Sequence, residues 1–198
     1  DKQQLHRMIL LGDAGAGKTS IILKLVQGNF YPNRPCTTGI DFYFLPLQFG
    51  DPKIKFQVFD TGGHDRFDTI TENYLRGADG ALLVYDLNAA DSYAKAVQWF
   101  NKLIEKGYDY PKVLVGNKKD QIESPDIKQA QEFANEKQIS FIQTSAKTGE
   151  NIEETIFALA KAILDRKKAQ PSPSPTPKPI KVVVKKEEKE SKCCKNTT

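Results

Sequence analysis

The chain has 198 residues, 39% of them hydrophobic and 27% charged, so it is long enough to bury one substantial core. Its net charge is +4, but residues 1–168 hold 22 basic and 22 acidic side chains, whereas residues 169–198 hold seven Lys and three Glu. The neutral charge of residues 1–168 argues against a nucleic-acid surface. Three Cys and two His without ligand spacing argue against a disulfide framework or a zinc site. No apolar stretch approaches the ~20 residues that a membrane span needs.

The first predicted elements are a strand over residues 5–11 and a helix over residues 18–27. Between them lies a glycine-rich segment with the spacing GxxxxGKT, which in this position is typical of a phosphate-binding P-loop. Its glycines let backbone N–H groups approach phosphate oxygens, and the N-terminus of the helix adds its dipole. Lys18 is expected to reach the β- and γ-phosphates and the Thr19 hydroxyl to bind Mg²⁺. A glycine-rich turn before an ordinary helix is the alternative. The segment reads Gly12-Asp13-Ala14-Gly15-Ala16-Gly17-Lys18-Thr19.

The rest of the chain continues to alternate strands and helices. Further strands are predicted over residues 40–49, 53–60, 80–86, 112–116 and 139–144, and helices over 67–76, 91–106, 126–137 and 152–168. Only the second and third strands lack an intervening helix, and Gly50-Asp51-Pro52 between them predicts an antiparallel hairpin. We therefore predict an α/β domain over residues 1–168: a six-stranded, mostly parallel sheet with one antiparallel strand and five flanking helices.

Polar residues lie at the ends of several predicted strands. The P-loop, Asp60, Asn117 and Ser145 all occupy such positions. In a sheet of this kind ligands bind at the carboxyl ends of the strands, so these residues are expected to converge on one rim.

Two segments on that rim indicate which nucleotide is bound. Asn117-Lys118-Lys119-Asp120 follows a buried strand, and a carboxylate at Asp120 can accept hydrogen bonds from N1–H and N2–H₂ of guanine, which adenine does not offer. Thr144-Ser145-Ala146-Lys147 follows the last strand and could supply a backbone N–H to the guanine O6. Taken alone, the first segment also fits a charged surface loop, and the second also fits an ordinary strand end. Their order and spacing after a P-loop predict guanine nucleotide.

With these motifs the chain resembles the Ras superfamily of small GTPases over nearly all of residues 5–168, and Rab proteins most closely. The resemblance implies the P-loop GTPase fold, a GTP/GDP switch, and a Thr37 that coordinates Mg²⁺ and senses the γ-phosphate. It further implies that Asp60 holds Mg²⁺ through water, that Gly63 donates its N–H to the γ-phosphate, and that Phe30 packs edge-on against guanine. The segments that carry it are Thr38-Gly39-Ile40-Asp41-Phe42, Lys55-Phe56-Gln57-Val58-Phe59-Asp60, Arg66-Phe67-Asp68-Thr69-Ile70-Thr71, Tyr74-Leu75-Arg76-Gly77-Ala78 and Leu83-Val84-Tyr85-Asp86.

The expected nucleotide contacts combine the motifs with this resemblance. They are Asp13, Ala14, Gly15, Ala16, Gly17, Lys18, Thr19, Ser20, Phe30, Thr37, Gly63, Asn117, Lys118, Asp120, Ser145, Ala146 and Lys147. The resemblance also implies regulation of vesicle traffic through effector proteins, an exchange factor, a GTPase-activating protein and prenyl-chaperone proteins, with a monomeric GTPase domain.

Two departures from the family pattern concern hydrolysis. The position after Gly63 is normally a glutamine that orients the attacking water, and here it is His64. A neutral imidazole has one donor and cannot both accept from water and donate to the γ-phosphate as a carboxamide does. Ala14 stands where Ras has glycine and Rab proteins usually have serine, and its methyl would crowd the transition state. Both changes predict slow intrinsic hydrolysis, with tolerated drift in a working GTPase as the alternative.

A third departure could offset these two. Arg34-Pro35-Cys36-Thr37-Thr38-Gly39 is similar to a segment of heterotrimeric G-protein α subunits, in which an arginine before the Mg²⁺-binding threonine acts as a finger in cis. Such a finger increases the rate by about 10³–10⁵. Our hypothesis is that Arg34 partly replaces an external activator, and the alternative is a solvated loop arginine. The catalytic candidates are thus Lys18, Arg34, Gly63 and His64.

Residues 169–198 are predicted to form a disordered tail. Prolines alternate with Ser, Thr and Lys, which favours an extended linker, and lysines surround Cys193-Cys194 near the end. Four residues follow Cys194, so the arrangement is not CaaX. It resembles the Rab pattern for double geranylgeranylation, and two lipid chains are what stable anchoring requires. We expect a prenylated protein on the cytoplasmic face of intracellular membranes that cycles with the cytosol. Two idle thiols are the alternative, and the polar start of the chain predicts no signal peptide.

Two other functions stay open. One is a metabolic P-loop enzyme such as a nucleotide kinase, although no second substrate site or lid-like arginine cluster is recognisable in the sequence. The other is a membrane scaffold that keeps GTP bound with negligible hydrolysis.

Overall fold

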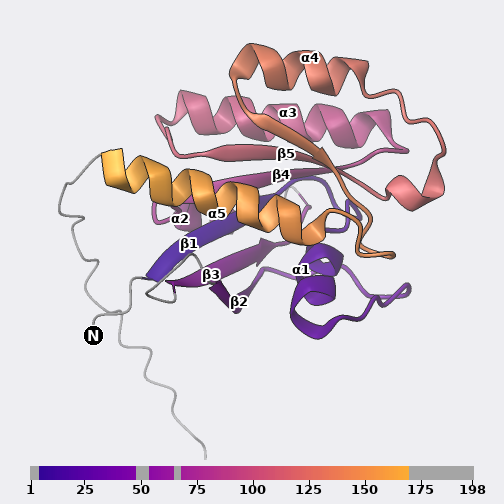
Figure 1. Cartoon of the computed structure of the whole chain (residues 1–198), viewed down its shortest axis with the longest axis horizontal. Coiled ribbons are helices and arrows are strands. Elements are labelled where there is room, and N and C mark those ends of the chain that lie inside the picture. Colours follow the sequence, from indigo (N-terminus) through magenta and orange to yellow (C-terminus); the bar gives the residue numbers. More distant parts are fainter. Residues whose placement is uncertain (1–4, 48–53, 65–67, 170–198) are drawn as a thin grey trace, which may run out of the picture.

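The structure is a computed structural model that describes residues 5–47, 54–64 and 68–169. Strands and helices alternate along it (Figure 1). In chain order they are β1 (Leu5–Leu11), α1 (Lys18–Gln27), β2 (Ile40–Leu47), β3 (Ile54–Thr61), α2 (Asp68–Leu75), β4 (Gly80–Asp86), α3 (Ala90–Glu105), β5 (Lys112–Asn117), the 3₁₀ turn η2 (Lys119–Gln121), α4 (Lys128–Lys137), β6 (Ser140–Gln143) and α5 (Ile152–Ala169).

The strands form one six-stranded sheet in the order β2-β3-β1-β4-β5-β6. β2 runs antiparallel to β3, in a register that joins Ile40 to Thr61 and Leu47 to Ile54, and the other neighbours are parallel. The predicted hairpin and the predicted fold class are thereby confirmed, although the turn at residues 50–52 lies outside the described residues.

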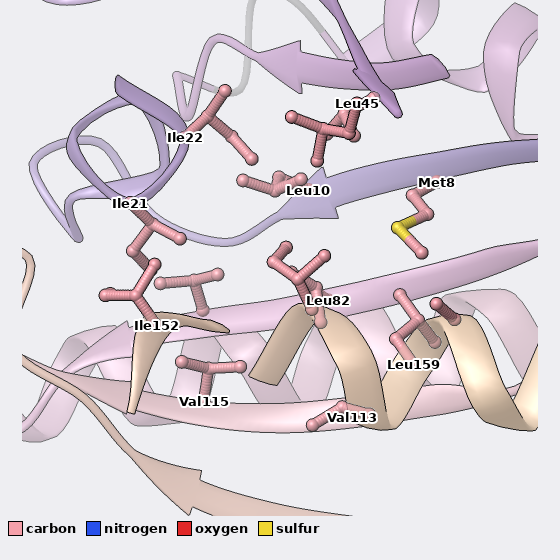
Figure 2. Packing of buried hydrophobic residues seen from close by; sticks show 14 of the residues in the cluster. Met8, Leu10, Ile21, Ile22, Leu45, Leu82, Val113, Val115, Ile152 and Leu159 are labelled. Carbon is pink, nitrogen blue, oxygen red and sulfur yellow. The ribbon is translucent and has the colours of Figure 1, made fainter. Parts of the chain in front are cut away.

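The sheet is covered by helices on both faces because its central strands are apolar on both sides. Met8 and Leu10 of β1 face the helices α1 and α5, whereas Ile9 and Leu11 face α2, α3 and α4. Figure 2 shows the first of these two clusters gathered around Leu10. The second contains Trp99, Phe100 and Leu103 of α3. With both faces covered, the rim at the strand ends remains for ligands.

Several predicted boundaries are wrong by one or two residues. α4 begins at Lys128 rather than at Asp126, because the Asp126 carboxylate accepts the Lys128 N–H at 3.2 Å in a local turn. β5 extends to Asn117, so this residue ends the strand rather than following it. The sequence analysis also missed η2, directly after that strand. Within the described ranges, no helix is both long and apolar enough to cross a membrane.

Candidate functional site

A cavity of about 270 Å³ opens at the rim formed by the carboxyl ends of the strands. It is bounded by the P-loop, the segment between α1 and β2, the end of β3, and the turns that follow β5 and β6. Thus segments far apart in the sequence converge as predicted. Among the expected nucleotide contacts, its lining includes Ala14, Gly15, Gly17, Lys18, Thr19, Ser20, Phe30, Thr37, Gly63, Asn117, Lys118, Asp120, Ala146 and Lys147.

Three other expected contacts lie behind this lining. The carbonyls of Asp13 and Ala16 accept side-chain hydrogen bonds, and Ser145 is fully buried. The Asp13 carboxylate accepts the N–H of Ala14 at 2.8 Å and so closes a turn within the loop. These residues therefore shape the wall of the cavity.

The P-loop backbone requires glycine at its last position before α1. Gly17 has φ 91, in the left-handed region. A Cβ there would lie 2.2 Å from the Nδ2 of Asn117. The loop and the end of β5 are consequently in direct contact, which brings the phosphate-binding segment against the base-recognition segment.

Lys18 is buried at the floor of the loop, with 5% of its surface exposed. Its Nζ donates to the carbonyl of Gly12 at 2.9 Å and to that of Asp13 at 2.7 Å. Burial lowers the pKa of Lys18 to about 8, although the carboxylates of Asp60 and Asp13 oppose the shift. The ammonium is held where bound phosphates would stabilise its charged form.

Thr19, Thr37 and Asp60 come together from three separate segments. The Oγ1 of Thr19 lies 2.8 Å from that of Thr37 and donates to Asp60 Oδ2 at 2.6 Å, and Thr37 Oγ1 lies 3.4 Å from the same oxygen. Asp60 is fully buried, and its Oδ1 has no hydrogen-bond partner. Burial raises the pKa of Asp60, although the Thr19 hydroxyl and Lys18 oppose the rise.

A buried carboxylate with a free oxygen beside two hydroxyls is a set of hard oxygen donors, which fits Mg²⁺. Elsewhere the described residues contain no group of three or more His, Cys, Asp and Glu side chains suited to a metal. The mixed set of Thr19, Thr37 and Asp60 is therefore the candidate metal site of the described chain.

Asn117 joins the two ends of the cavity. Its Nδ2 donates to the Ala16 carbonyl at 2.9 Å, and its Oδ1 accepts from Thr144 Oγ1 at 3.2 Å and from the Ala146 N–H at 3.1 Å. With 1% of its surface exposed, this side chain ties the P-loop to the turn after β6. Besides the predicted contact with the nucleotide, Asn117 thus holds together the P-loop, the end of β5 and the turn after β6.

The carboxylate of Asp120 is held in place at the base end. Its Oδ1 accepts from Ser145 Oγ at 2.6 Å, its Oδ2 lies 3.8 Å from Lys147 Nζ, and 10% of its side chain is exposed. The orientation is therefore fixed by a residue that also belongs to the predicted base site. This arrangement fits a ligand edge that presents N–H donors, as guanine does.

The segment before β2 contributes residues that the sequence analysis did not assign. Tyr31, Pro32 and Cys36 line the cavity together with Arg34. The positive charge of Arg34 also acts on Tyr43 and opposes the rise in the Tyr43 pKa that burial causes. Their position between the P-loop and Thr37, the predicted metal ligand, is the sequence signal that could have identified them.

The remaining candidates have different positions. Phe30 packs against the core cluster beneath α1 as well as lining the cavity. His64 is exposed and is not part of the cavity lining. Asp86, to which the sequence analysis gave no role, accepts a hydrogen bond from Lys118 Nζ at 2.7 Å. Its place at the end of a buried strand on this rim was the available signal. Cys193 and Cys194 lie outside the described residues.

Comparison with known proteins agrees with this geometry. The Ras family model matches residues 7–165. The Ras-related protein RAB1BV of Beta vulgaris is 39% identical over 184 residues, which cover 87% of this chain and 85% of the relative. The GTP-binding protein YPTM2 of Zea mays is 36% identical over 171 residues, 85% of this chain and 84% of the relative. The Ras-related protein Rab-8B of Dictyostelium discoideum is 39% identical over 165 residues, 82% of this chain and 81% of the relative.

The family match spans nearly all of the sheet and helices, and two of these relatives, matched over most of their length, carry Rab names. A nucleotide-binding cavity at this rim is what such a relationship leads one to expect. The chain belongs to the Ras family and is a Rab-like small GTPase.

Proposed function

We propose that this protein is a guanine-nucleotide switch in vesicle traffic that cycles between GTP and GDP with Mg²⁺ as its cofactor. The observation that carries the proposal is the distribution of groups around one cavity. Its lining combines Lys18 and the bonded pair Thr19 and Thr37, which would suit phosphates, with an Asp120 carboxylate held by Ser145, which would suit a base.

The phosphate end would act through positioning and charge. The Lys18 ammonium and the backbone N–H groups of the P-loop would bind the β- and γ-phosphates, because these groups already face the cavity. Mg²⁺, held by the hydroxyls of Thr19 and Thr37 and through water by Asp60, would supply charge neutralisation at the phosphate oxygens.

The switch would work through the two segments that flank the β2–β3 hairpin. Thr37 precedes β2 and Gly63 follows β3, and the Gly62 N–H donates to the Gly39 carbonyl at 2.8 Å. The two segments are thus joined directly beside the cavity. Loss of the γ-phosphate would release Thr37 and Gly63 together, and effectors would distinguish the two states by these segments.

Intrinsic hydrolysis would be slow because the water-positioning group is missing. His64 is exposed and is not among the residues that line the cavity, whereas Ala14 is. Arg34 lies on the cavity wall and would act as a finger in cis that restores part of the rate. An activating protein that brings its own arginine and glutamine would make His64 dispensable.

The tail would hold the switch at a membrane. Arg166, Lys167 and Lys168 already make the last turn of α5 basic, and more lysines follow toward Cys193 and Cys194. Prenylation of both cysteines would provide the two lipid chains of a stable anchor, and the lysines would attract anionic lipid. Mass spectrometry of the protein from its native cells tests this, because an unmodified tail would contradict it.

A second function is a membrane scaffold that retains GTP with negligible hydrolysis. The exposed position of His64 favours it. The nucleotide retained after purification separates the two functions, since mainly GTP indicates the scaffold and mainly GDP indicates a cycling switch.

The proposed ligand is tested by competitive binding of GDP and ADP in the presence of Mg²⁺. A site built to hydrogen-bond the guanine edge should reject ADP by about 10⁴-fold. Asp120→Ala should remove most of this discrimination, whereas Glu150→Gln, which alters an exposed side chain nearby, should not. Equal affinity for GDP and ADP in the unaltered protein would show that the proposed ligand is wrong.

A further inference from the structure

Asp86 ends β4 on the same rim as the nucleotide-binding residues, although it does not line the cavity. It pairs in register with Asn117 of β5, and the next N–H along the chain, that of Leu87, donates to the Asn117 carbonyl at 3.0 Å. Its position relative to the base-recognition segment is therefore fixed by the sheet itself.

The two carboxylate oxygens of Asp86 have separate partners. Oδ2 accepts from Lys118 Nζ at 2.7 Å, whereas Oδ1 accepts from the backbone N–H and from the side-chain Nδ2 of Asn88, at 3.0 and 2.9 Å. Only 16% of the Asp86 side chain is exposed. Burial opposes ionisation, but the bonds from Lys118 and Asn88 outweigh it and lower the pKa of Asp86, so the carboxylate is charged at neutral pH.

Lys118 has a strained backbone at this point. Its φ of 66 lies in the left-handed region, which is unfavourable for a residue with a side chain. The strain is followed at once by η2, which contains Asp120. Lys118 also lines the cavity, so its conformation affects the wall that a base would contact as well as the direction of the following turn.

We propose that Asp86 is a positioning residue for the nucleotide. By holding the Lys118 ammonium, it fixes the Lys118 side chain at the cavity wall. The same contact stabilises the left-handed backbone of Lys118, which directs the following turn that contains Asp120. The inference rests on the proposed binding of guanine nucleotide. It adds a residue outside the binding motifs that controls how long the nucleotide stays bound.

A simpler role for Asp86 would be to stabilise only the turn at Asn88. The two roles use different oxygens, so they can be separated. Asp86→Asn keeps one oxygen acceptor for Asn88 and replaces the oxygen opposite Lys118 by an NH₂ group, which cannot accept from the ammonium. Asp86→Glu keeps an anionic acceptor.

The test is the dissociation rate of fluorescent GDP in Mg²⁺, measured for the full chain. Loss of a charge-assisted hydrogen bond should make Asp86→Asn release GDP about tenfold faster, and Asp86→Glu should restore part of the difference. Lys118→Met should also accelerate release, and the double variant Asp86→Asn/Lys118→Met should be no faster than Lys118→Met alone. Glu150→Gln, which breaks the exposed ion pair of Lys119 in the same turn, should release GDP at the unaltered rate.

Each result has a distinct meaning. The inference is overturned if Asp86→Asn releases GDP at the rate of the unaltered protein. It is also overturned if Asp86→Asn accelerates GDP release by the same factor in Lys118→Met as in the unaltered protein, because Asp86 would then act on the turn alone. If Asp86→Asn does not fold, Lys118→Met decides, because it leaves Asp86 and its bonds from Asn88 in place: normal release by Lys118→Met contradicts the proposal. Failure of the unaltered protein to bind GDP would instead contradict the proposed function and this inference with it.

Discussion

Gly63 packs so closely on the P-loop that a Cβ added to it would lie 2.3 Å from the nitrogen of Ala14. The obstructing atoms belong to the backbone of the loop, so they cannot rotate away as a side-chain end can. The segment after β3 and the phosphate-binding loop therefore share one surface, and that surface has no room for a methyl group.

Gly63→Ala should accordingly force this segment away from the γ-phosphate position. We expect the ratio of GTP affinity to GDP affinity to fall by about tenfold, the effect of one lost hydrogen bond to a charged group. Competition against fluorescent GDP measures both affinities. Gly77→Ala is the matched control, because its Cβ would meet the end of the Arg7 side chain at 3.2 Å and the Tyr74 carbonyl oxygen at an ordinary contact distance of 3.9 Å. An unchanged ratio in Gly63→Ala would contradict the expected contact.

Restoring the usual hydrolytic residues should speed up GTP turnover. His64→Gln replaces an exposed imidazole by a carboxamide that can orient water, and Ala14→Gly removes a methyl from the cavity wall. A misplaced attacking water can lower the rate of such a reaction by up to about 10²-fold. The double variant should therefore hydrolyse GTP faster by up to about that factor in a single-turnover measurement. GDP dissociation should stay unchanged. If the double variant hydrolyses GTP at the parent rate, the explanation for slow turnover is wrong.

Removal of the Arg34 guanidinium should slow intrinsic hydrolysis. A complete arginine finger contributes about 10³-fold or more, and a partial one should still give a clear drop in Arg34→Ala. Arg34→Lys keeps the charge but lacks the planar guanidinium, so its hydrolysis rate should lie between those of the parent protein and Arg34→Ala. Equal single-turnover rates for Arg34→Ala and the parent would identify Arg34 as a solvated loop residue.

The affinity for GDP should fall between pH 7 and pH 9. The pKa of Lys18 is lowered to about 8 by burial, whereas bound phosphates favour the ammonium and raise it. Above pH 8 binding must therefore take up a proton, and the affinity should decrease by up to about tenfold per pH unit. Equilibrium titrations across this range measure the slope. Guanosine, which has no phosphate, is the control ligand and should bind equally well throughout.

A partly buried polar cluster on the opposite rim should contribute to stability in a pH-dependent way. Asp79 accepts from the Arg7 N–H at 2.8 Å and pairs with Lys167 Nζ at 3.0 Å, and His6 Nδ1 lies 3.7 Å away. Burial opposes the shift, but these partners lower the pKa of Asp79. Asp79→Asn should cost about 1–3 kcal/mol in free energy of unfolding at pH 7.

The sign of the pH dependence follows from the lowered pKa. The contribution of Asp79 is complete above the ordinary Asp pKa of about 3.9 and is lost as the pH falls further, through the lower value in the folded protein. Urea unfolding of both proteins at pH 7 and at about pH 2.5, below the ordinary Asp value, measures this. Glu136→Gln, in which 70% of the altered side chain is exposed, should change stability by less than about 1 kcal/mol. A pH-independent difference for Asp79→Asn would contradict the argument.

The fold was predictable because its signals are local. Continuous apolar runs in β4 and β5 indicated buried parallel strands, and a turn signal between two strands without a helix indicated the hairpin of β2 and β3. The boundary of α4 was not predictable from periodicity, because the Asp126 side chain competes with the helix for a backbone N–H. η2 was missed for a related reason: it depends on the left-handed backbone of Lys118, which side-chain patterning does not encode.

The candidate site was predictable where a short motif includes the groups that act. Thr19 and Asp60 lie in such motifs, and the structure brings them within hydrogen-bonding distance. The pairing of Asp86 with Lys118 was not predictable, because it depends on the register that brings the end of β4 beside the end of β5, which Lys118 follows. For the same reason the sequence indicated that Asn117 belongs to the site without indicating that it holds Ala16 and Ala146.

We therefore expect the side chain of Asn117 to make the binding of the two halves of a nucleotide thermodynamically dependent on each other. Because one amide is bonded both to the P-loop and to the turn at Ala146, ordering either segment reduces the entropy that remains to be lost in the other. Guanosine and pyrophosphate, supplied as separate molecules, should each increase the affinity for the other. Cooperativity between two fragments that never touch would then be a property of the protein rather than of the bond that normally links them.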